Sequence, residues 1–215
     1  ELKEMTHGNR ERNFFPGKLY FADVFRENRG FDVVIANPPY IKEYTDKHAF
    51  DGLRNSSYYQ GKMDIWYLFA CDNIDILKEN AILTFIATNN WVTNFGASKM
   101  RNKIIKDTKI LKLINFKNYK IFESAGIQTM IMMFQKNNQV DNYSFDYREL
   151  NENATEFSNV VNLLNKKQMD DNIIFTPSII KNDYIDKLLI FNNPIIENVL
   201  QIIEKFDNFK LTERS

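Results

Sequence analysis

An asparagine, two prolines and a tyrosine stand in a row directly after an apolar run, as Asn37, Pro38, Pro39 and Tyr40. Two prolines remove two backbone donors and fix φ, and Pro38 disfavours a helical conformation at Asn37. This NPPY segment (residues 37–40) is therefore stiff, and its carbonyl oxygens are free to accept hydrogen bonds. A turn without a chemical role would need neither the amide before the prolines nor the ring after them.

The NPPY segment suits an exocyclic amine such as adenine N6. The lone pair of such an amine is delocalised into the ring, which makes the nitrogen a poor nucleophile. The Asn37 side-chain oxygen and the Pro38 backbone oxygen could each accept one N–H and aim the lone pair at an activated methyl group, by positioning and preorganised electrostatics. The ring of Tyr40 could stack on a base flipped out of a duplex.

The elements around the NPPY segment predict how it is held. Residues 31–36 (FDVVIA) form a β-branched run between Gly30 and a proline, which predicts a strand buried on both faces. Other expected strands lie at 18–21, 81–87, 110–116, 127–134 and 143–147, and expected helices at 63–78 and 96–106. This alternation predicts an α/β doubly wound sheet, whose strands bind ligands at their carboxyl ends. A loop of about 20 residues without clear periodicity follows Tyr40, and such long loops are usually functional.

The chain after residue 150 is predicted to be mainly helical, with helices at roughly 155–167, 181–190 and 194–206. We therefore expect residues 1–150 to form a partial catalytic domain and residues 151–215 to form a connector. The opening residue is Glu1 and the first residues are polar, which suggests a piece of a longer protein.

Composition limits the class of protein. The 28 basic and 28 acidic side chains cancel, so nucleic-acid binding must be local or come from another domain. A single cysteine, Cys71, fits a reducing compartment. No apolar run approaches the length of a membrane span, and no leader opens the chain. These features predict a cytoplasmic protein that binds neither a membrane nor, in this segment, a metal.

These motifs resemble the amino-methyltransferases of DNA over roughly residues 17–136, and among them the adenine-N6 enzymes of single-chain type II restriction-modification systems. The resemblance implies a Rossmann-like S-adenosylmethionine-dependent methyltransferase fold, and it assigns catalysis to the NPPY segment. It also implies double-stranded DNA as the partner, bound through domains mostly outside these residues. The function expected from it is methyl transfer from S-adenosylmethionine to a flipped-out adenine.

The resemblance also assigns individual residues. Asp23, within residues 21–25 (FADVF), resembles the acidic residue at the end of a strand that contacts the cofactor adenine. Asp64 opens a segment (DIWY) that resembles the helix on one side of the cofactor and target pocket, and Asp64 and Asn37 are assigned to the cofactor. Phe122 resembles the aromatic wall opposite Tyr40.

Other residues of the same segments receive no chemical role. Trp66 and Tyr67 are expected to pack in a helix, and Trp91 and Phe95 stay unassigned on loops. Thr88 stands where the family commonly has proline.

Two expected cofactor elements are missing from the sequence. The seven glycines never cluster into a cofactor-binding loop, and no acidic residue follows a second strand ahead of Asp23. We therefore expect a methyltransferase domain truncated at its N-terminus that binds S-adenosylmethionine weakly or not at all by itself.

The NPPY segment leaves alternatives open. It also serves enzymes that methylate a glutamine amide in release factors and some that methylate guanine N2 in RNA. The chain could also be a non-catalytic fragment of a larger protein.

Overall fold

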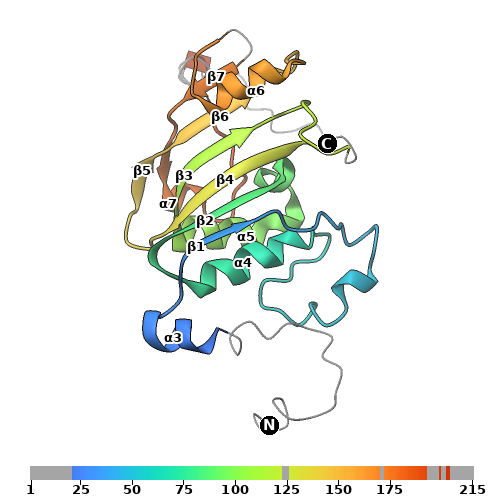
Figure 1. Cartoon of the computed structure of the whole chain (residues 1–215), viewed down its shortest axis with the longest axis vertical. Coiled ribbons are helices and arrows are strands. Elements are labelled where there is room, and N and C mark those ends of the chain that lie inside the picture. The colour runs from blue at the N-terminus through green and yellow to red at the C-terminus, as the bar shows by residue number, and fades with distance from the viewer. Residues whose placement is uncertain (1–20, 123–125, 170–171, 193–198, 200–201, 204–215) are drawn as a thin grey trace.

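The computed structural model describes residues 21–122, 126–169, 172–192, 199 and 202–203. Its centre is a mixed sheet of six strands in the order β1-β2-β4-β3-β6-β7 (Figure 1). These strands are β1 (Phe31–Ala36), β2 (Leu77–Thr88), β3 (Thr108–Asn115), β4 (Thr129–Lys136), β6 (Asp146–Leu150) and β7 (Asn172–Phe175). A separate pair joins β5 (Asn142–Ser144) to β8 (Ser178–Ile180).

Among the described residues, five α-helices with defined bounds and three short 3-10 helices accompany the strands, and residues 199, 202 and 203 are also helical. The α-helices are α3 (Ala22–Asn28), α4 (Trp66–Ile76), α5 (Ser98–Asp107), α6 (Phe157–Leu164) and α7 (Lys181–Tyr184). The 3-10 helices are η1 (His48–Phe50), η2 (Asn89–Val92) and η3 (Phe95–Ala97).

Strand β4 runs against its neighbours. It is antiparallel to both β2 and β3, whereas β1 is parallel to β2 and β3 is parallel to β6. The connection from β3 to β4, residues 116–128, has no helix among its described residues. A parallel neighbour would need a crossover that returns the chain to the starting edge, whereas this connection lets the chain turn back beside β3. The alternation of helix and strand predicted the fold class but not this reversal.

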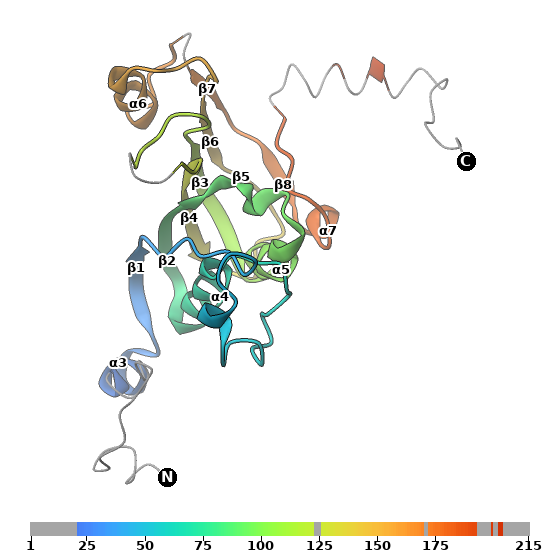
Figure 2. The same ribbon diagram turned by 90° about the vertical axis from the view of Figure 1, so that its right-hand side faces the viewer.

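The two faces of the sheet are covered unequally. Helices α4 and α5 pack on one face, where the main hydrophobic core lies (Figures 1 and 2). Helix α6 covers the other face near β3 and β6, over a smaller cluster that includes Ile114, Leu150 and Leu163. The sheet therefore has helices on both faces, as the predicted α/β class requires.

Strand β1 is not buried on both faces, so that prediction was wrong. Val33 is 54% exposed and Ile35 is 77% exposed. The alternate residues Val34 and Ala36 pack against the main core. The physical reason is position: β1 is an edge strand of the described sheet, and no described helix covers the face that Val33 and Ile35 share.

The segment around Asp23 also differs from its prediction. Residues 22–28 form helix α3, so Asp23 lies in the first turn of a helix and not at the end of a strand. Residues 18–20 of the predicted strand lie outside the described residues. The Asp23 carboxylate is exposed and pairs with Arg26 one turn later at 2.8 Å, an i,i+3 contact that a helix favours.

Helix α4 ends two residues earlier than predicted. It stops at Ile76, because Leu77 already belongs to β2 and is the partner of Phe31 in β1. Asn80, two residues beyond the predicted end of the helix, lies within β2 with a φ of 64°. Tertiary pairing with β1 has overridden the helical periodicity that continues to Lys78.

Beyond residue 150 the structure combines helices with short strands. Helix α6 matches the first predicted helix, whereas α7 spans only four residues of the second. Most of the third, 194–206, lies outside the described residues. Strand β7 extends the main sheet beside β6, and Ile179 and Leu189 are buried in the main core. The division of the chain at residue 150 stays a prediction.

Candidate active site

The NPPY segment leaves the carboxyl end of β1 and folds over the end of β2. Ala36, the last residue of β1, is the partner of Phe85 in β2. The hydroxyl of Tyr40 lies 2.5 Å from the side-chain oxygen of Asn37 and 2.8 Å from the backbone oxygen of Ile86. These contacts join the first and last residues of the segment to each other and to the neighbouring strand.

The two predicted acceptors are available. Asn37 is exposed, while the Pro38 side chain is buried and anchors the segment. No donor among the described residues binds the Pro38 carbonyl oxygen. A planar amine that approaches Asn37 would therefore meet carbonyl oxygens that have capacity to accept.

Tyr40 and Phe122 are brought together although they are far apart in the sequence. Their ring centroids are 6.4 Å apart and the planes are tilted by 47°. Phe122 lies in the connection between β3 and β4. The structure thus places the two predicted stacking residues beside each other, with Tyr40 in contact with Asn37, and their action on a base stays a prediction.

The long loop after Tyr40 is closed at its base. The Ile65 amide donates to the Ile41 carbonyl at 2.9 Å, and the Glu43 amide donates to the Met63 carbonyl at the same distance. Residues 41–43 and 63–65 therefore run antiparallel beside the NPPY segment. The two ends of the loop are therefore joined to each other next to Tyr40. This pairing holds the C-terminal side of the NPPY segment in place.

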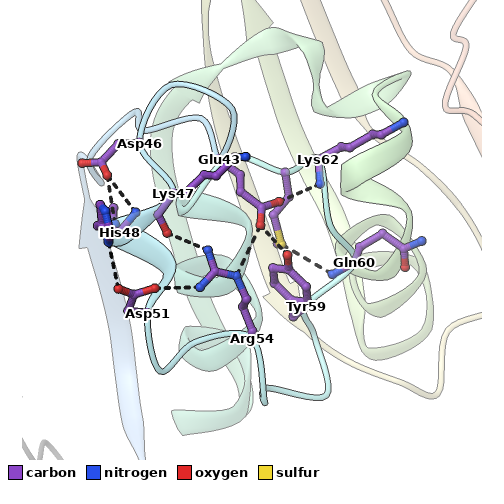
Figure 3. A network of polar contacts seen from close by, with 11 residues as sticks. Glu43, Asp46, Lys47, His48, Asp51, Arg54, Tyr59, Gln60 and Lys62 are labelled. Carbon is purple, nitrogen blue, oxygen red and sulfur yellow. Dashed lines mark hydrogen bonds and ion pairs between the residues drawn. The ribbon is translucent and has the colours of Figure 1, made fainter.

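Glu43 organises the interior of this loop (Figure 3). Its carboxylate accepts the backbone amide of Lys62 at 2.8 Å and the hydroxyl of Tyr59, and Arg54 lies 3.7 Å away. Arg54 also donates to Asp51 and to the Lys47 carbonyl, both at 2.7 Å. The sequence reading missed Glu43, because a carboxylate that binds its own loop leaves no periodic signal.

Asp64 lies buried at the entrance of helix α4. Its side chain is 2% exposed, and neither carboxylate oxygen has a hydrogen-bond partner among the described residues. Burial raises the pKa of Asp64 to about 6, although the charge of Lys42 and the nearby backbone of Trp66, Ile65 and Ile41, which forms no well-aligned hydrogen bond to the carboxylate, oppose the shift. An unpartnered buried carboxylate is costly, and such groups concentrate at functional sites.

Asp64 contributes to the electrostatics of its neighbours as well. Burial, assisted by the charge of Asp64, raises the pKa of Tyr40 to about 12 and also raises that of Tyr67. Tyr40 therefore keeps its proton at neutral pH. Trp66 and Tyr67 are fully buried in α4, which confirms their predicted packing role.

A second loop, at the end of β2, is held by a buried arginine that the sequence reading did not single out. Arg101 donates to three backbone oxygens. It lies 2.7 Å from that of Trp91 and 3.3 Å from that of Lys187, and it also contacts that of Asn94. Trp91 is completely buried, whereas Phe95 on the same loop is 67% exposed. Of the two aromatics left unassigned from the sequence, Trp91 is a core residue and Phe95 faces solvent.

Side-chain amides fix the connection that carries Phe122. The Asn89 side chain donates to Asn115 at 2.9 Å and to Gln128 at 3.3 Å, and Gln128 donates to Asn118 at 2.6 Å. This chain of contacts runs along the ends of β2, β3 and β4. It holds the ends of the connection in which Phe122 lies. The many asparagines of the sequence gave no signal that these particular ones form the contacts.

Within the described residues, no group of histidine, cysteine or acidic side chains could hold a metal ion. In the same residues, no helix is both long enough and apolar enough to cross a membrane.

Comparison with known proteins decides the family. The sequence profile of the Eco57I restriction-modification methylase family matches residues 2–122, which is more than half of the chain. The chain belongs to this family. The matched residues include the NPPY segment, the long loop and Phe122.

Curated relatives agree with the assignment to this family. The chain is 28% identical over 123 residues to the type II restriction enzyme and methyltransferase RM.Eco57I of Escherichia coli, over 55% of this chain and 12% of the relative. It is 26% identical over 117 residues to the type II methyltransferase M.HincII of Haemophilus influenzae, over 52% of this chain and 23% of the relative. The chain therefore spans less than a quarter of the length of either protein.

Solved structures confirm the fold. A nuclease-deletion mutant of the type ISP restriction-modification enzyme LlaGI superposes with a TM-score of 0.55, at 16% identity, over 91% of this chain and 21% of that one. A modification subunit of a type I restriction enzyme from Vibrio vulnificus gives a TM-score of 0.52, at 13% identity, over 81% and 40%. The α/β Rossmann-like methyltransferase fold predicted from the sequence is therefore the observed one.

Proposed function

We propose that this chain is the catalytic part of a DNA methyltransferase that transfers a methyl group from S-adenosylmethionine to N6 of a flipped-out adenine in a restriction-modification system. The observation that carries the proposal is that Tyr40, which contacts the Asn37 acceptor, has the Phe122 ring 6.4 Å from its own ring. Membership of the Eco57I family supports DNA as the substrate over a release-factor glutamine or an RNA guanine.

The mechanism follows from the position of the acceptors. The amine of the target base donates its two N–H groups to Asn37 Oδ1 and the Pro38 oxygen, which draws the lone pair out of the ring. Tyr40 and Phe122 hold the base by aromatic contact, at about 1–3 kcal/mol for a stacked base. Oriented acceptors in a fixed segment act without reorganising during the reaction.

The residues present fit one side of a cofactor site. When bound, S-adenosylmethionine supplies the activated methyl group and carries positive charge. The unpartnered carboxylate of Asp64 matches such a charge, and Asn37 is another residue that the resemblance assigns to the cofactor. Asp23 was predicted to contact the cofactor adenine from the end of a strand. It lies in a helix instead, so its position does not support that contact. DNA reading by domains outside these residues, and weak cofactor binding by this chain alone, remain part of the proposal.

The experiment is methyl transfer to DNA by the full-length protein, with nucleoside analysis of the product. N6-methyladenine is expected from the wild type. Asn37→Ala is expected to reduce transfer at least 100-fold, by analogy with the roughly 10²–10³ that one preorganised polar group contributes in other active sites.

Asn153→Ala provides the matched control, because Asn153 is exposed on a turn away from the NPPY segment. Undiminished transfer by Asn37→Ala would overturn the catalytic assignment. N4-methylcytosine as the product would overturn the adenine assignment, and methylation of RNA or protein alone would overturn DNA as the substrate.

A further inference from the structure

The side-chain amide of Asn37 has two ends of nearly equal size and opposite chemistry. Its oxygen can accept a hydrogen bond from the substrate amine, whereas its nitrogen can only donate. Rotation by half a turn would present a donor to a donor and would abolish the proposed interaction. Because Asn37 is exposed, packing alone does not fix the rotation.

One described group contacts the Asn37 amide, and it is the hydroxyl of Tyr40. The phenolic oxygen lies 2.5 Å from Asn37 Oδ1. A phenol that donates to this atom selects the orientation in which the oxygen faces Tyr40. A carbonyl oxygen has two lone pairs, so the second remains for an incoming N–H.

The hydroxyl is itself fixed to the sheet. It also lies 2.8 Å from the backbone oxygen of Ile86, in the middle of the paired part of β2. The phenol has one proton, so the two oxygens share it as acceptors. Strand β2, which contains Ile86, lies between β1 and β4 in the sheet. Because these strands hold Ile86 in place, its hydrogen bond also holds the phenolic oxygen in place.

We infer that the Tyr40 hydroxyl is a positioning group for methyl transfer, which ties the Asn37 amide to strand β2 in the orientation that accepts the substrate amine. This role is separate from the stacking role of the Tyr40 ring. It rests on the proposed function, because it assumes that Asn37 Oδ1 binds the amine. Tyr40 keeps its proton at neutral pH, so it acts as a donor and not as a base.

Tyr40→Phe in the full-length protein separates the two roles, because it removes the hydroxyl and keeps the ring. Loss of one hydrogen bond that orients a reacting group should lower kcat about 3- to 10-fold. The KM for DNA, and the fluorescence of 2-aminopurine placed at the target position, should stay within about 2-fold, since base stacking is retained. The pH dependence of kcat should be unchanged.

Tyr44→Phe is the matched control, because Tyr44 lies in the following loop, is largely exposed and forms no hydrogen bond through its hydroxyl with the described residues. An unchanged or increased kcat for Tyr40→Phe would overturn the inference. Equal changes in kcat, KM and 2-aminopurine fluorescence would also overturn it, since the hydroxyl would then act on base binding or folding. Failure of the proposed function would show differently, as absent methyl transfer by the wild type.

Discussion

The indole of Trp66 donates a hydrogen bond to the hydroxyl of Thr88 at 2.9 Å, and both residues are buried. This contact joins the first turn of helix α4 to the last residue of strand β2. It also explains why threonine is accommodated at position 88, where the family commonly has proline, because proline has no hydroxyl to accept from the indole.

Thr88→Val tests this contact. Valine keeps the shape of threonine but leaves the indole N–H buried without a partner, which costs about 1–3 kcal/mol. We expect the free energy of unfolding in urea to fall by that amount. Thr93→Val, at an exposed position on the next loop, should change it by less than about 0.5 kcal/mol. Equal stabilities of the two variants would show that the indole is satisfied in another way.

Asp64→Asn should change how stability depends on pH. The carboxyl has a pKa of 3.8 when unfolded and about 6 when folded, so ionisation is harder in the folded state. Ionisation of Asp64 therefore does not lower the free energy of unfolding below pH 3.8. As the pH rises through about 6, it lowers the free energy of unfolding by up to about 3 kcal/mol.

The asparagine variant removes this loss. It should be more stable than the wild type at pH 7.5 and nearly equal to it at pH 4, as measured by urea unfolding. Because Asp64 is proposed to face the cofactor, the same variant should bind S-adenosylmethionine more weakly in the full-length protein. A variant less stable than the wild type at pH 7.5 would contradict the unpartnered state of the carboxylate.

Gly96→Ala should separate two loops of the candidate site. A Cβ atom at Gly96 would lie 2.2 Å from the backbone oxygen of Lys62, so one of the two segments must move. The expected cost is about 1–3 kcal/mol of unfolding free energy, with faster amide hydrogen exchange in both loops. Gly126→Ala is the control, because a Cβ there meets no atom within 4 Å. Comparable exchange in the two variants would refute the close packing.

The 215 residues alone are expected to bind S-adenosylmethionine weakly or not at all. Their glycines do not cluster into a cofactor loop, and the described residues provide only one side of the proposed site. Isothermal titration calorimetry of this chain, beside the full-length protein, measures the difference. Micromolar binding by the chain alone would contradict the prediction.

Local chemistry explains which features were predictable. The NPPY segment constrains its own backbone, because prolines restrict φ whatever surrounds them. The apolar runs at 81–87, 110–116 and 127–134 are long enough to predict strands without knowledge of their partners. The α/β class therefore followed from the sequence pattern. The pairing of Tyr40 with Phe122 was implied only by the family resemblance, and the two rings lie 6.4 Å apart.

The remaining features depend on which segments become neighbours. An apolar run indicates that a strand is buried, but not whether a helix covers both of its faces, so the exposure of Val33 and Ile35 could not be read from it. The local sequence pattern likewise did not predict the helix at Asp23 or the antiparallel direction of β4.

The sequence by itself determined the stiff acceptor loop, the fold class and the family of this protein. Only the tertiary structure decided that Ile86 offers a backbone oxygen to Tyr40 and that Asp64 is buried without a partner. The physical reason is that backbone acceptors and desolvation are properties of a position in space, and every residue type has the same backbone oxygen.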